Sequence, residues 1–457
     1  MKILFVLSFI AFFSINAYAQ APQSFPYHAS KAVFINMSEV RIKYTYDVRK
    51  KKVFAKSKVK FKCIESGYPL LDLVPGANVV ELDGEPVIGG LVEIQDPDSA
   101  TTMRVLEKNV EKNIEHELYV EFEMNRNLIF GDNFVRSAFA MSDLSDRQYF
   151  EKYGPANLEF DSIHYIFDVE VVGTSTSHVV MHNGTAIEKG TNSWTIDFPA
   201  HFNASSLYFH LFEVGAFEIV NDSMQLNDKK IDLIFYARSR SDAEDGLIQA
   251  KKNLEEFNAL FGPYCYSKFV GLITGEDNGG MEYGGATMSS IWALRHEINH
   301  SWFARCIQPA NGNAGWMDEA IAVWSDNNFE TATGVPKREE VNLANFSQYQ
   351  RKTPMESYEE GEMFISELDY LLANVGGMKK LLAEYFQVKK FKITNTPFFQ
   401  NFLEQKSKRS LNEYFKKYVY GKENFKFVEQ KLKVIKNRKT GVVYHREMSA
   451  QDLRNQL

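Results

Sequence analysis

Cysteine is scarce in this chain, which has only three such residues among 457: Cys63, Cys265 and Cys306. An odd number at scattered positions excludes a framework of several disulfides. We expect Cys306 to be a small buried apolar side chain, and a single bridge between Cys63 and Cys265 stays open. Stability must therefore come mainly from packed cores, for which an apolar content of 44% is ample.

An excess of positive charge is also absent. The formal net charge at pH 7 is −7, and the isoelectric point is about 5.9. Nucleic acids and anionic membranes attract basic surfaces, so neither is a predicted partner. Charges of both signs are interleaved along the sequence, which is typical of a solvated protein surface. The sequence has no internal repeat and no low-complexity linker.

Long apolar segments are missing beyond the first residues. Lys2 is followed by an apolar stretch over residues 3–15, which is too short to span a bilayer. Residues 17–19, Ala-Tyr-Ala, then form a small-x-small cleavage pattern. We therefore predict a signal peptide over residues 1–19, cleaved before Gln20, and export to the periplasm or out of the cell. No transmembrane segment is predicted in the mature chain.

The first half of the mature chain has the period of β-strands. Apolar and polar residues alternate in several segments, which turn signals such as Asp-Gly at 83–84 and Asn-Gly at 183–184 separate. The alternating segments are residues 40–48, 53–61, 116–122, 163–171 and 178–182. We predict a large antiparallel β domain here.

Beyond residue 228 the period becomes mainly helical. Ser241 and Glu244 have the spacing of a capping box, and apolar residues follow at helical intervals as far as Phe261. Strands are expected at residues 231–237 and 269–274, and the chain is mostly helical from Glu359 onward. The length of the chain predicts two or three domains, and the order of elements predicts a multidomain α+β fold.

One short motif has the spacing of metal ligands. His296 and His300 are four residues apart, so on a helix they lie on one face and can meet at one point. Glu297 lies about 100° further round the helix, where it can reach a bound water without being a ligand. We expect Ser289 and Ser290 to cap this helix. The plain alternative is a surface helix that carries both histidines by chance.

A catalytic zinc site needs a third protein ligand and one open position. Glu319 follows His300 by nineteen residues, which is enough for the motif helix to end and a second helix, from about Trp316, to return. We therefore predict one zinc ion per chain, held by His296, His300 and Glu319.

These residues also carry a resemblance to a known family. The sequence Gly279-Gly280-Met281-Glu282-Tyr283, the histidine motif and Glu319, in that order, resembles the M1 family of zinc aminopeptidases. The resemblance implies a saddle-shaped N-terminal β domain over residues 20–220. It implies a thermolysin-like, mainly helical zinc peptidase domain over residues 221–422, and residues 423–457 remain as a short C-terminal extension.

Three departures from the family pattern stand out. Tyr283 occupies a position where many relatives have asparagine. Glu282 and His296 are 14 residues apart, a shorter step than is usual in the family. The large helical C-terminal domain of many relatives is expected to be absent, which would leave the site more open.

The resemblance implies hydrolysis of the N-terminal peptide bond of peptides. Glu297 is the predicted general base, which takes a proton from the attacking water. Tyr358 matches the family's Tyr-x-x-Gly helix start, so its hydroxyl is the predicted hydrogen-bond donor to the oxyanion. Its plain alternative is an ordinary surface tyrosine.

Substrate binding is predicted to depend on the glycine-rich segment. Glu282 is expected to pair with the substrate's α-ammonium, and Gly279, Gly280 and Met281 to line the peptide. The plain alternative for Glu282 is an exposed loop charge. Two other function classes stay open: a zinc endopeptidase of the same fold, or a non-catalytic peptide-binding protein. Asn183 and Asn203 begin Asn-x-Ser/Thr sequences, which matter only in a glycosylating host. The sequence makes no prediction about oligomeric state.

Overall fold

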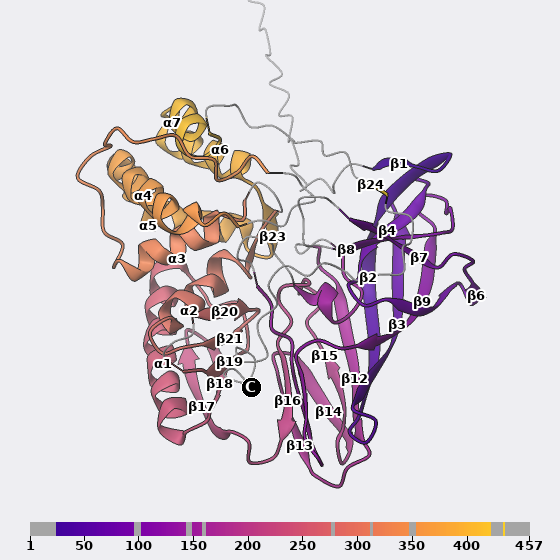
Figure 1. Ribbon diagram of the computed structural model, residues 1–457. Helices are drawn as coiled ribbons and strands as arrows, with labels where there is room; N and C mark the ends of the chain where they lie inside the picture. The colour runs from indigo at the N-terminus through magenta and orange to yellow at the C-terminus, as the bar shows by residue number, and fades with distance from the viewer. Residues whose placement is uncertain are drawn as a thin grey trace, which may run out of the picture.

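The computed structural model describes residues 24–95, 102–142, 149–157, 161–275, 279–310, 314–346, 353–421 and 433–434. Most strands belong to the first part of the chain and most helices to the second, at the right and left of Figure 1. The predicted signal peptide lies outside these residues. Within the described ranges, no helix combines the length and the apolar character that a membrane crossing needs.

A large curled sheet forms the first part, with β2 (Ser30–Asp47) at its centre. β3 (Lys52–Cys63) pairs with β2 in the antiparallel direction, but β12 (His164–Val172) and β4 (Tyr68–Asp72) pair with it in parallel. The predicted antiparallel domain is therefore antiparallel in most of its pairs but parallel in these two, because long crossovers rather than hairpins return the two strands to β2. The other strands of this sheet are β1 (Phe25–Tyr27), β5 (Ala77–Leu82), β6 (Glu85–Pro86), β7 (Leu91–Gln95), β8 (Thr102–Leu106), β9 (Glu115–Met124), β14 (Thr185–Gly190), β15 (Ser193–Asp197) and β24 (Lys433–Val434).

The alternating pattern of β3 separates an apolar face from a charged face. Every second side chain is buried, while the lysines between them face solvent and pair with acids on the neighbouring strands. Lys56 lies 2.9 Å from Glu121 on β9, and Lys60 lies 2.9 Å from Glu39 on β2. Exposed pairs of this kind each contribute little to stability, at most about 1 kcal/mol. They do keep the outer face of the sheet polar and close to neutral.

A smaller sheet lies between the two parts in Figure 1. It contains β10 (Leu128–Phe130), β11 (Val135–Ala138), β13 (His178–His182) and β16 (Phe209–Glu213). The predicted turn at Asn183 follows β13, and its side chain is buried. The Asn183 amide donates to the carbonyls of Ser206 (2.6 Å) and Gly284 (2.9 Å). This asparagine therefore ties the first part of the chain to the second. Asn203 is buried as well, and its side chain accepts hydrogen bonds from Ser205 and Ser206.

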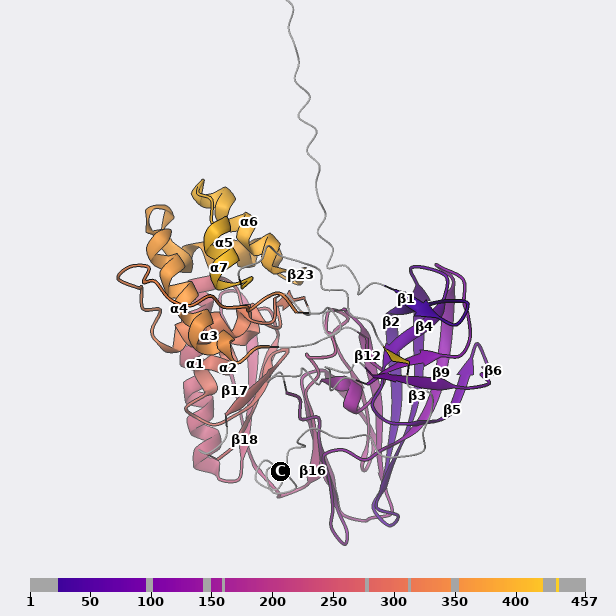
Figure 2. The same cartoon turned by 45° about the horizontal axis from the view of Figure 1, so that its top comes forward.

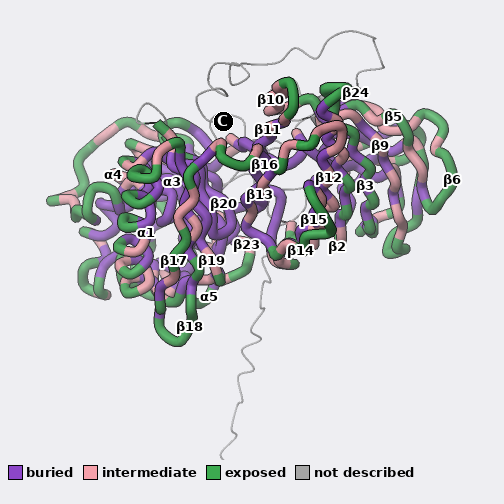
Figure 3. The backbone as a smooth tube through the Cα atoms, turned by 90° about the horizontal axis from the view of Figure 1, so that it is seen from below, coloured by how far each residue is buried: buried purple, intermediate pink, exposed green. Residues whose placement is uncertain are grey.

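The second part contains a five-stranded sheet in the order β17-β18-β19-β21-β20. β18 (Lys229–Ala237), β19 (Lys268–Ile273) and β21 (Ala286–Ser289) are parallel, and β17 (Glu218–Leu226) and β20 (Gly280–Tyr283) are antiparallel strands at its two edges. One apolar core runs through both parts, and the buried residues in Figure 3 follow it. Because this core is continuous, it does not mark where one domain ends and the next begins. The domain boundaries at residues 220 and 422 stay predictions.

Helix α1 (Arg240–Phe261) packs on this sheet and begins before the predicted capping box. Ser239, not Ser241, is the N-cap: it has an extended backbone, and its side chain accepts a hydrogen bond from the amide of Asp242. The prediction was two residues late because Ser241 already lies within the helix.

The remaining helices lie together at the left and top of Figures 1 and 2. The predicted caps of the motif helix are wrong, because Ser289 ends β21 and a turn separates Ser290 from α2. Ala293 is the N-cap residue, and no side chain caps this helix. The helices are α2 (Leu294–Phe303), α3 (Met317–Asp326), α4 (Glu356–Leu371), α5 (Gly377–Lys389), α6 (Thr396–Ser407) and α7 (Asn412–Tyr418). Short elements complete the fold: β22 (Ile307–Pro309), β23 (Lys392–Thr394), and single 3-10 turns at Phe150–Lys152 and Ala373–Val375.

The cysteines pair differently from the prediction. Cys265 and Cys306 form a disulfide, and Cys63 is a buried free thiol in β3. The chain turns after α2 and brings Cys306 to the loop that follows α1, a contact that sequence separation does not reveal. The bond fixes the end of the motif helix to that loop.

We expect this disulfide to stabilise the fold by about 4 kcal/mol, because it closes a loop between residues 41 apart in the unfolded chain. Replacing Cys265 and Cys306 together by alanine should lower the free energy of unfolding by that order, measured in urea. Reductant should destabilise the wild type but not the double variant. The Cys63→Ala variant is the control and should remain sensitive to reductant. Equal stability of the wild type with and without reductant would contradict the expectation.

Candidate metal centre

Helices α2 and α3 bring the three predicted metal ligands together. His296 and His300 lie one turn apart on α2, with ring centroids 4.8 Å apart. Glu319 comes from the first turn of α3. Its Oε2 lies 3.0 Å from Nε2 of His296 and 3.7 Å from Nε2 of His300. One ligand atom from each residue lies within 4.8 Å of the others, so the set fits a single ion with two nitrogen ligands and one oxygen ligand.

Asp326, which the sequence analysis did not identify, supports His296 from behind. Nδ1 of His296 donates a hydrogen bond to Oδ2 of Asp326 at 2.8 Å. This bond fixes the ring so that Nε2 faces Glu319 and His300. Asp326 ends α3, seven residues beyond Glu319 and hence about two helical turns along the same face. That spacing is the signal by which it could have been found.

The carboxylates around His296 dominate its protonation. Burial alone would lower its pKa, but the hydrogen bonds to Asp326 and Glu319 raise the pKa well above the ordinary value. Without a cation, the two carboxylates therefore favour the protonated form of the ring. A cation at this point replaces that proton, so metal binding should release protons.

Glu297 lies on the other side of the histidine pair. It is 5% exposed, and its carboxylate packs against the backbone of β20. A Cβ atom at Gly280 would overlap this carboxylate, so the missing side chain at Gly280 provides the space for Glu297. Glu297, Glu282 and His300 each place one polar atom within 4.8 Å of the other two. Two acids thus lie beside the ligand cluster.

Glu282 is not the exposed loop charge of the plain alternative. It lies in the edge strand β20 and is only 3% exposed. Nη2 of Arg305 donates to its Oε1 at 2.6 Å, and this arginine is itself 3% exposed. Arg305 was not identified from the sequence. Met281 in the same strand pairs with Met288 of β21, and Gly279 precedes the strand.

Tyr358 lies near the metal cluster on α4. Its ring is parallel to that of His296 within 10°, with centroids 6.4 Å apart. Gly361, one turn along, lets α4 approach α3: a Cβ there would lie 2.8 Å from Cβ of Ala320, the neighbour of Glu319. The glycine of the Tyr-x-x-Gly pattern thus has a packing reason.

The chain resembles known proteins in part of its sequence and in its fold. No protein-family model matches the chain. Aminopeptidase B from Mus musculus is 28% identical over an alignment of 216 residues, which covers 36% of this chain and 33% of that protein. The chain thus spans about a third of the length of this curated relative.

Solved structures extend the likeness to most of the chain. The M1 zinc metallopeptidase of Deinococcus radiodurans, in a variant form, has a TM-score of 0.60 at 13% identity, over 87% of this chain and 96% of that one. The chain has the fold of the M1 zinc metallopeptidases. A further structure of that variant contains a Tyr-Ser-Ala substrate.

Two other solved structures also resemble the chain. Aminopeptidase A of Legionella pneumophila, solved with aspartic acid, has a TM-score of 0.64 at 10% identity, over 85% of this chain and 49% of that one. Leukotriene A4 hydrolase of Saccharomyces cerevisiae has a TM-score of 0.58 at 16% identity, over 81% and 65%. The predicted resemblance is confirmed at the level of the fold.

The M1 fold gives a place to the unusual Tyr283. Its hydroxyl donates to the carbonyl of Phe139 at 3.1 Å, and its ring packs edge-on against Tyr208. Tyr283 is buried and contacts the first part of the chain. At this position the tyrosine anchors β20 to the β-rich part.

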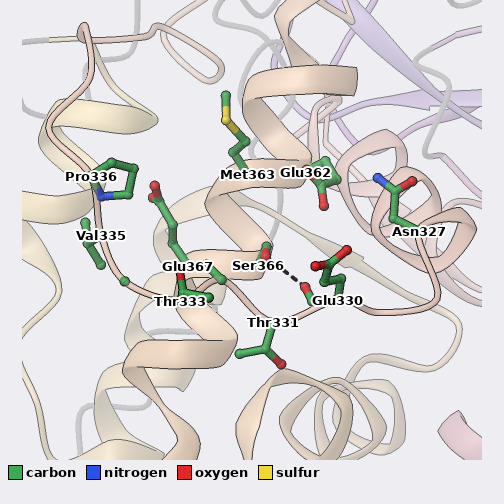
Figure 4. A pocket seen from close by; sticks show the side chains of 12 residues that line it. Asn327, Glu330, Thr331, Thr333, Val335, Pro336, Glu362, Met363, Ser366 and Glu367 are labelled. Carbon is green, nitrogen blue, oxygen red and sulfur yellow. Dashed lines mark hydrogen bonds between the residues drawn. The ribbon is translucent and has the colours of Figure 1, made fainter.

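A groove beside α4 is separate from the metal cluster of this M1 fold (Figure 4). It lies between the loop after α3 and the middle of α4, and none of the predicted site residues lines it. Burial, together with neighbouring Glu330 and Glu367, raises the pKa of Glu362 above its ordinary value, against a hydrogen bond from Asn327. Glu367 is itself paired with Arg338 at 3.1 Å, so its charge is compensated.

We expect Gly361→Ala to lower the free energy of unfolding by about 1–3 kcal/mol, because α4 must move away from α3. At an exposed position within a helix, the change from glycine to alanine would raise the free energy of unfolding by about 1 kcal/mol. The sign of the measured change therefore shows whether packing or helix propensity decides the outcome. Displacement of Glu319 and Tyr358 should also lower kcat. Urea unfolding and steady-state kinetics measure both effects. Gly76→Ala is the control, because a Cβ atom added at Gly76 would have no atom of a non-adjacent residue within 4 Å. A stabilised Gly361→Ala protein would refute the packing argument.

Proposed function

We propose that the protein is a zinc-dependent aminopeptidase, which hydrolyses the N-terminal peptide bond of peptides. The observation that carries the proposal is the convergence of His296, His300 and Glu319, with Glu297 and Glu282 beside them. The neighbours of this fold are named as zinc metallopeptidases and aminopeptidases, which supports it. Zinc held there supplies Lewis acidity and lowers the pKa of a bound water.

Each of this chain's own residues then has a distinct task. Glu297 is placed to accept a proton from the attacking water and to return it to the leaving amine. Tyr358 is the proposed donor to the oxyanion, since its ring lies beside His296. Asp326 holds the His296 ring in the orientation that directs Nε2 toward the other ligands.

Substrate binding is proposed along the edge strand β20. Its outer edge has no partner strand among the described residues, so a peptide backbone can add to it as a further strand. Gly279 and Gly280 keep this approach free of side chains, and Glu282 at the same strand offers a carboxylate to the α-ammonium. An enzyme that requires this contact between Glu282 and the α-ammonium of its substrate would be an exopeptidase.

Export remains part of the proposal. The sequence of residues 1–19 supports it, and so does the disulfide between Cys265 and Cys306, since such bonds persist in oxidising compartments. The division of the chain into a β domain, a thermolysin-like catalytic domain and a short extension is likewise proposed. The oligomeric state is left open.

We expect Glu297→Gln to keep one zinc per chain and to lose activity by at least about 10²-fold, because the amide cannot accept the proton. His296→Ala, His300→Ala and Glu319→Ala should each lose the metal. Metal analysis and turnover of aminoacyl-fluorophore substrates, with and without a chelator, test both statements. Glu359→Gln, an exposed acid on α4, is the control. Normal turnover by zinc-loaded Glu297→Gln would remove this residue from the mechanism.

The second prediction separates exopeptidase from endopeptidase action. The wild type should cleave a decapeptide with a free α-amine and leave its N-acetylated form intact. Glu282→Gln should lower kcat/KM on the free peptide, with a loss of roughly 2–4 kcal/mol in transition-state stabilisation, because a buried charged pair is lost. Product analysis by mass spectrometry identifies the bond that is cut. Equal cleavage of both peptides would replace the aminopeptidase with an endopeptidase, and zinc binding without any cleavage would leave a peptide-binding protein.

A further inference from the structure

The partner of Glu282 inside the protein is Arg305, just beyond the end of the motif helix. Nη2 of Arg305 donates to Oε1 of Glu282 at 2.6 Å, and its Nε approaches the main-chain carbonyl of the same residue at 3.4 Å. The guanidinium therefore contacts both the side chain and the backbone of Glu282. Because its nitrogens form a rigid planar fork, these two contacts fix the direction of the carboxylate.

The third arm of this arginine reaches the first part of the chain. Nη1 donates to Oγ of Ser205 at 2.8 Å, and the guanidinium carbon lies 5.5 Å from the ring centre of Tyr149. Ser205 lies in a turn that the Asn203 side chain holds through hydrogen bonds to Ser205 and Ser206. The position of Arg305 is thus set by residues far from the metal ligands in the sequence.

The other carboxylate oxygen of Glu282 remains available. Among the described residues, Oε2 has no hydrogen-bond partner, although the residue is only 3% exposed. Glu282 places a carboxylate oxygen within 4.8 Å of both a Glu297 oxygen and a His300 nitrogen. An ammonium group bound there would meet two carboxylates at the edge of the metal cluster.

We propose that Arg305 is a positioning residue for substrate selection. It holds one oxygen of Glu282 and leaves the other directed to the α-ammonium of the peptide, so that a free N-terminus is chosen over a blocked one. This inference rests on the proposed aminopeptidase function and deepens it. It also makes the Ser205 turn, in the β-rich part, a support of the substrate site.

A purely structural ion pair would behave differently. A buried pair can serve only to compensate two charges, and its loss then lowers stability without altering the choice of substrate. A positioning residue acts through Glu282, which contacts the α-ammonium in the ground state. Its loss should therefore appear mainly in KM, and mainly on substrates with a free amine.

The test compares Arg305→Gln, Arg305→Lys and Ser205→Ala with the wild type, all zinc-loaded. The probes are one aminoacyl-fluorophore with a free α-amine and its N-acetylated form. Zinc content, thermal unfolding, kcat and KM are measured for each protein. Arg136→Gln is the matched control, because Arg136 forms a partly buried pair with Glu213 on the small sheet, outside the site.

We expect Arg305→Gln to raise KM for the free-amine probe by about tenfold to a hundredfold, since a misaligned binding group loses roughly that much. kcat and zinc content should change little, and the preference for the free amine should fall. Arg305→Lys should restore part of the affinity, because it returns the charge without the fork. Ser205→Ala should raise KM by a smaller factor, and Arg136→Gln should leave KM unchanged.

Three results would overturn the inference. One is an unchanged KM and preference in folded Arg305→Gln. The second is a loss of zinc or of kcat as large as the rise in KM, which indicates a structural role alone. The third applies if Arg305→Gln does not fold, and it is an unchanged KM in both Arg305→Lys and Ser205→Ala. A wild type that cleaves neither probe, or both equally, would instead refute the proposed function itself.

Discussion

The chemistry of this molecule depends on the close contact between α2 and α3. The two histidines are neighbours by helical periodicity, but they become part of a candidate metal centre only where α3 presents Glu319 to them. Asp326 at the far end of α3 and Tyr358 on α4 join the same cluster. α4 approaches because Gly361 and Ala320 are both small. Small side chains behind the site therefore determine the positions of the polar groups within it.

Much of this arrangement was predictable where it depends on local patterns. The four-residue step between His296 and His300 fixes their relative placement on any helix. The strands of the curled sheet follow from alternation, and β3 has a strict in-out pattern. Glu319 was accessible because the intervening length suits one turn and a returning helix. The structure brings it to the histidines, as the sequence analysis expected.

Other features depend on contacts that no local pattern encodes. Arg305 meets Glu282 only because the chain turns after α2 and returns beside β20. Cys306 meets Cys265 for a similar reason, across a loop that contains β19, β20, β21 and α2. The parallel pairing of β12 with β2 joins residues more than a hundred positions apart. Cap positions failed for smaller reasons. At α1 the backbone conformation selects Ser239 rather than Ser241, and at α2 the nearby serines lie before the helix, which no side chain caps.

Two of the asparagines that begin Asn-x-Ser/Thr sequences, Asn183 and Asn203, have consequences for how the protein is produced. Both side chains are buried and use their amide groups to hold the junction between the β-rich part and the five-stranded sheet. Eukaryotic secretory systems attach sugars to such sequences while the chain is still emerging. A sugar on either amide would occupy the space that the junction needs, and on Asn183 it would also remove one of the two donated hydrogen bonds. The turn that supports Arg305 would then form incorrectly, so a host that does not attach sugars to asparagine is the appropriate one for preparing this enzyme.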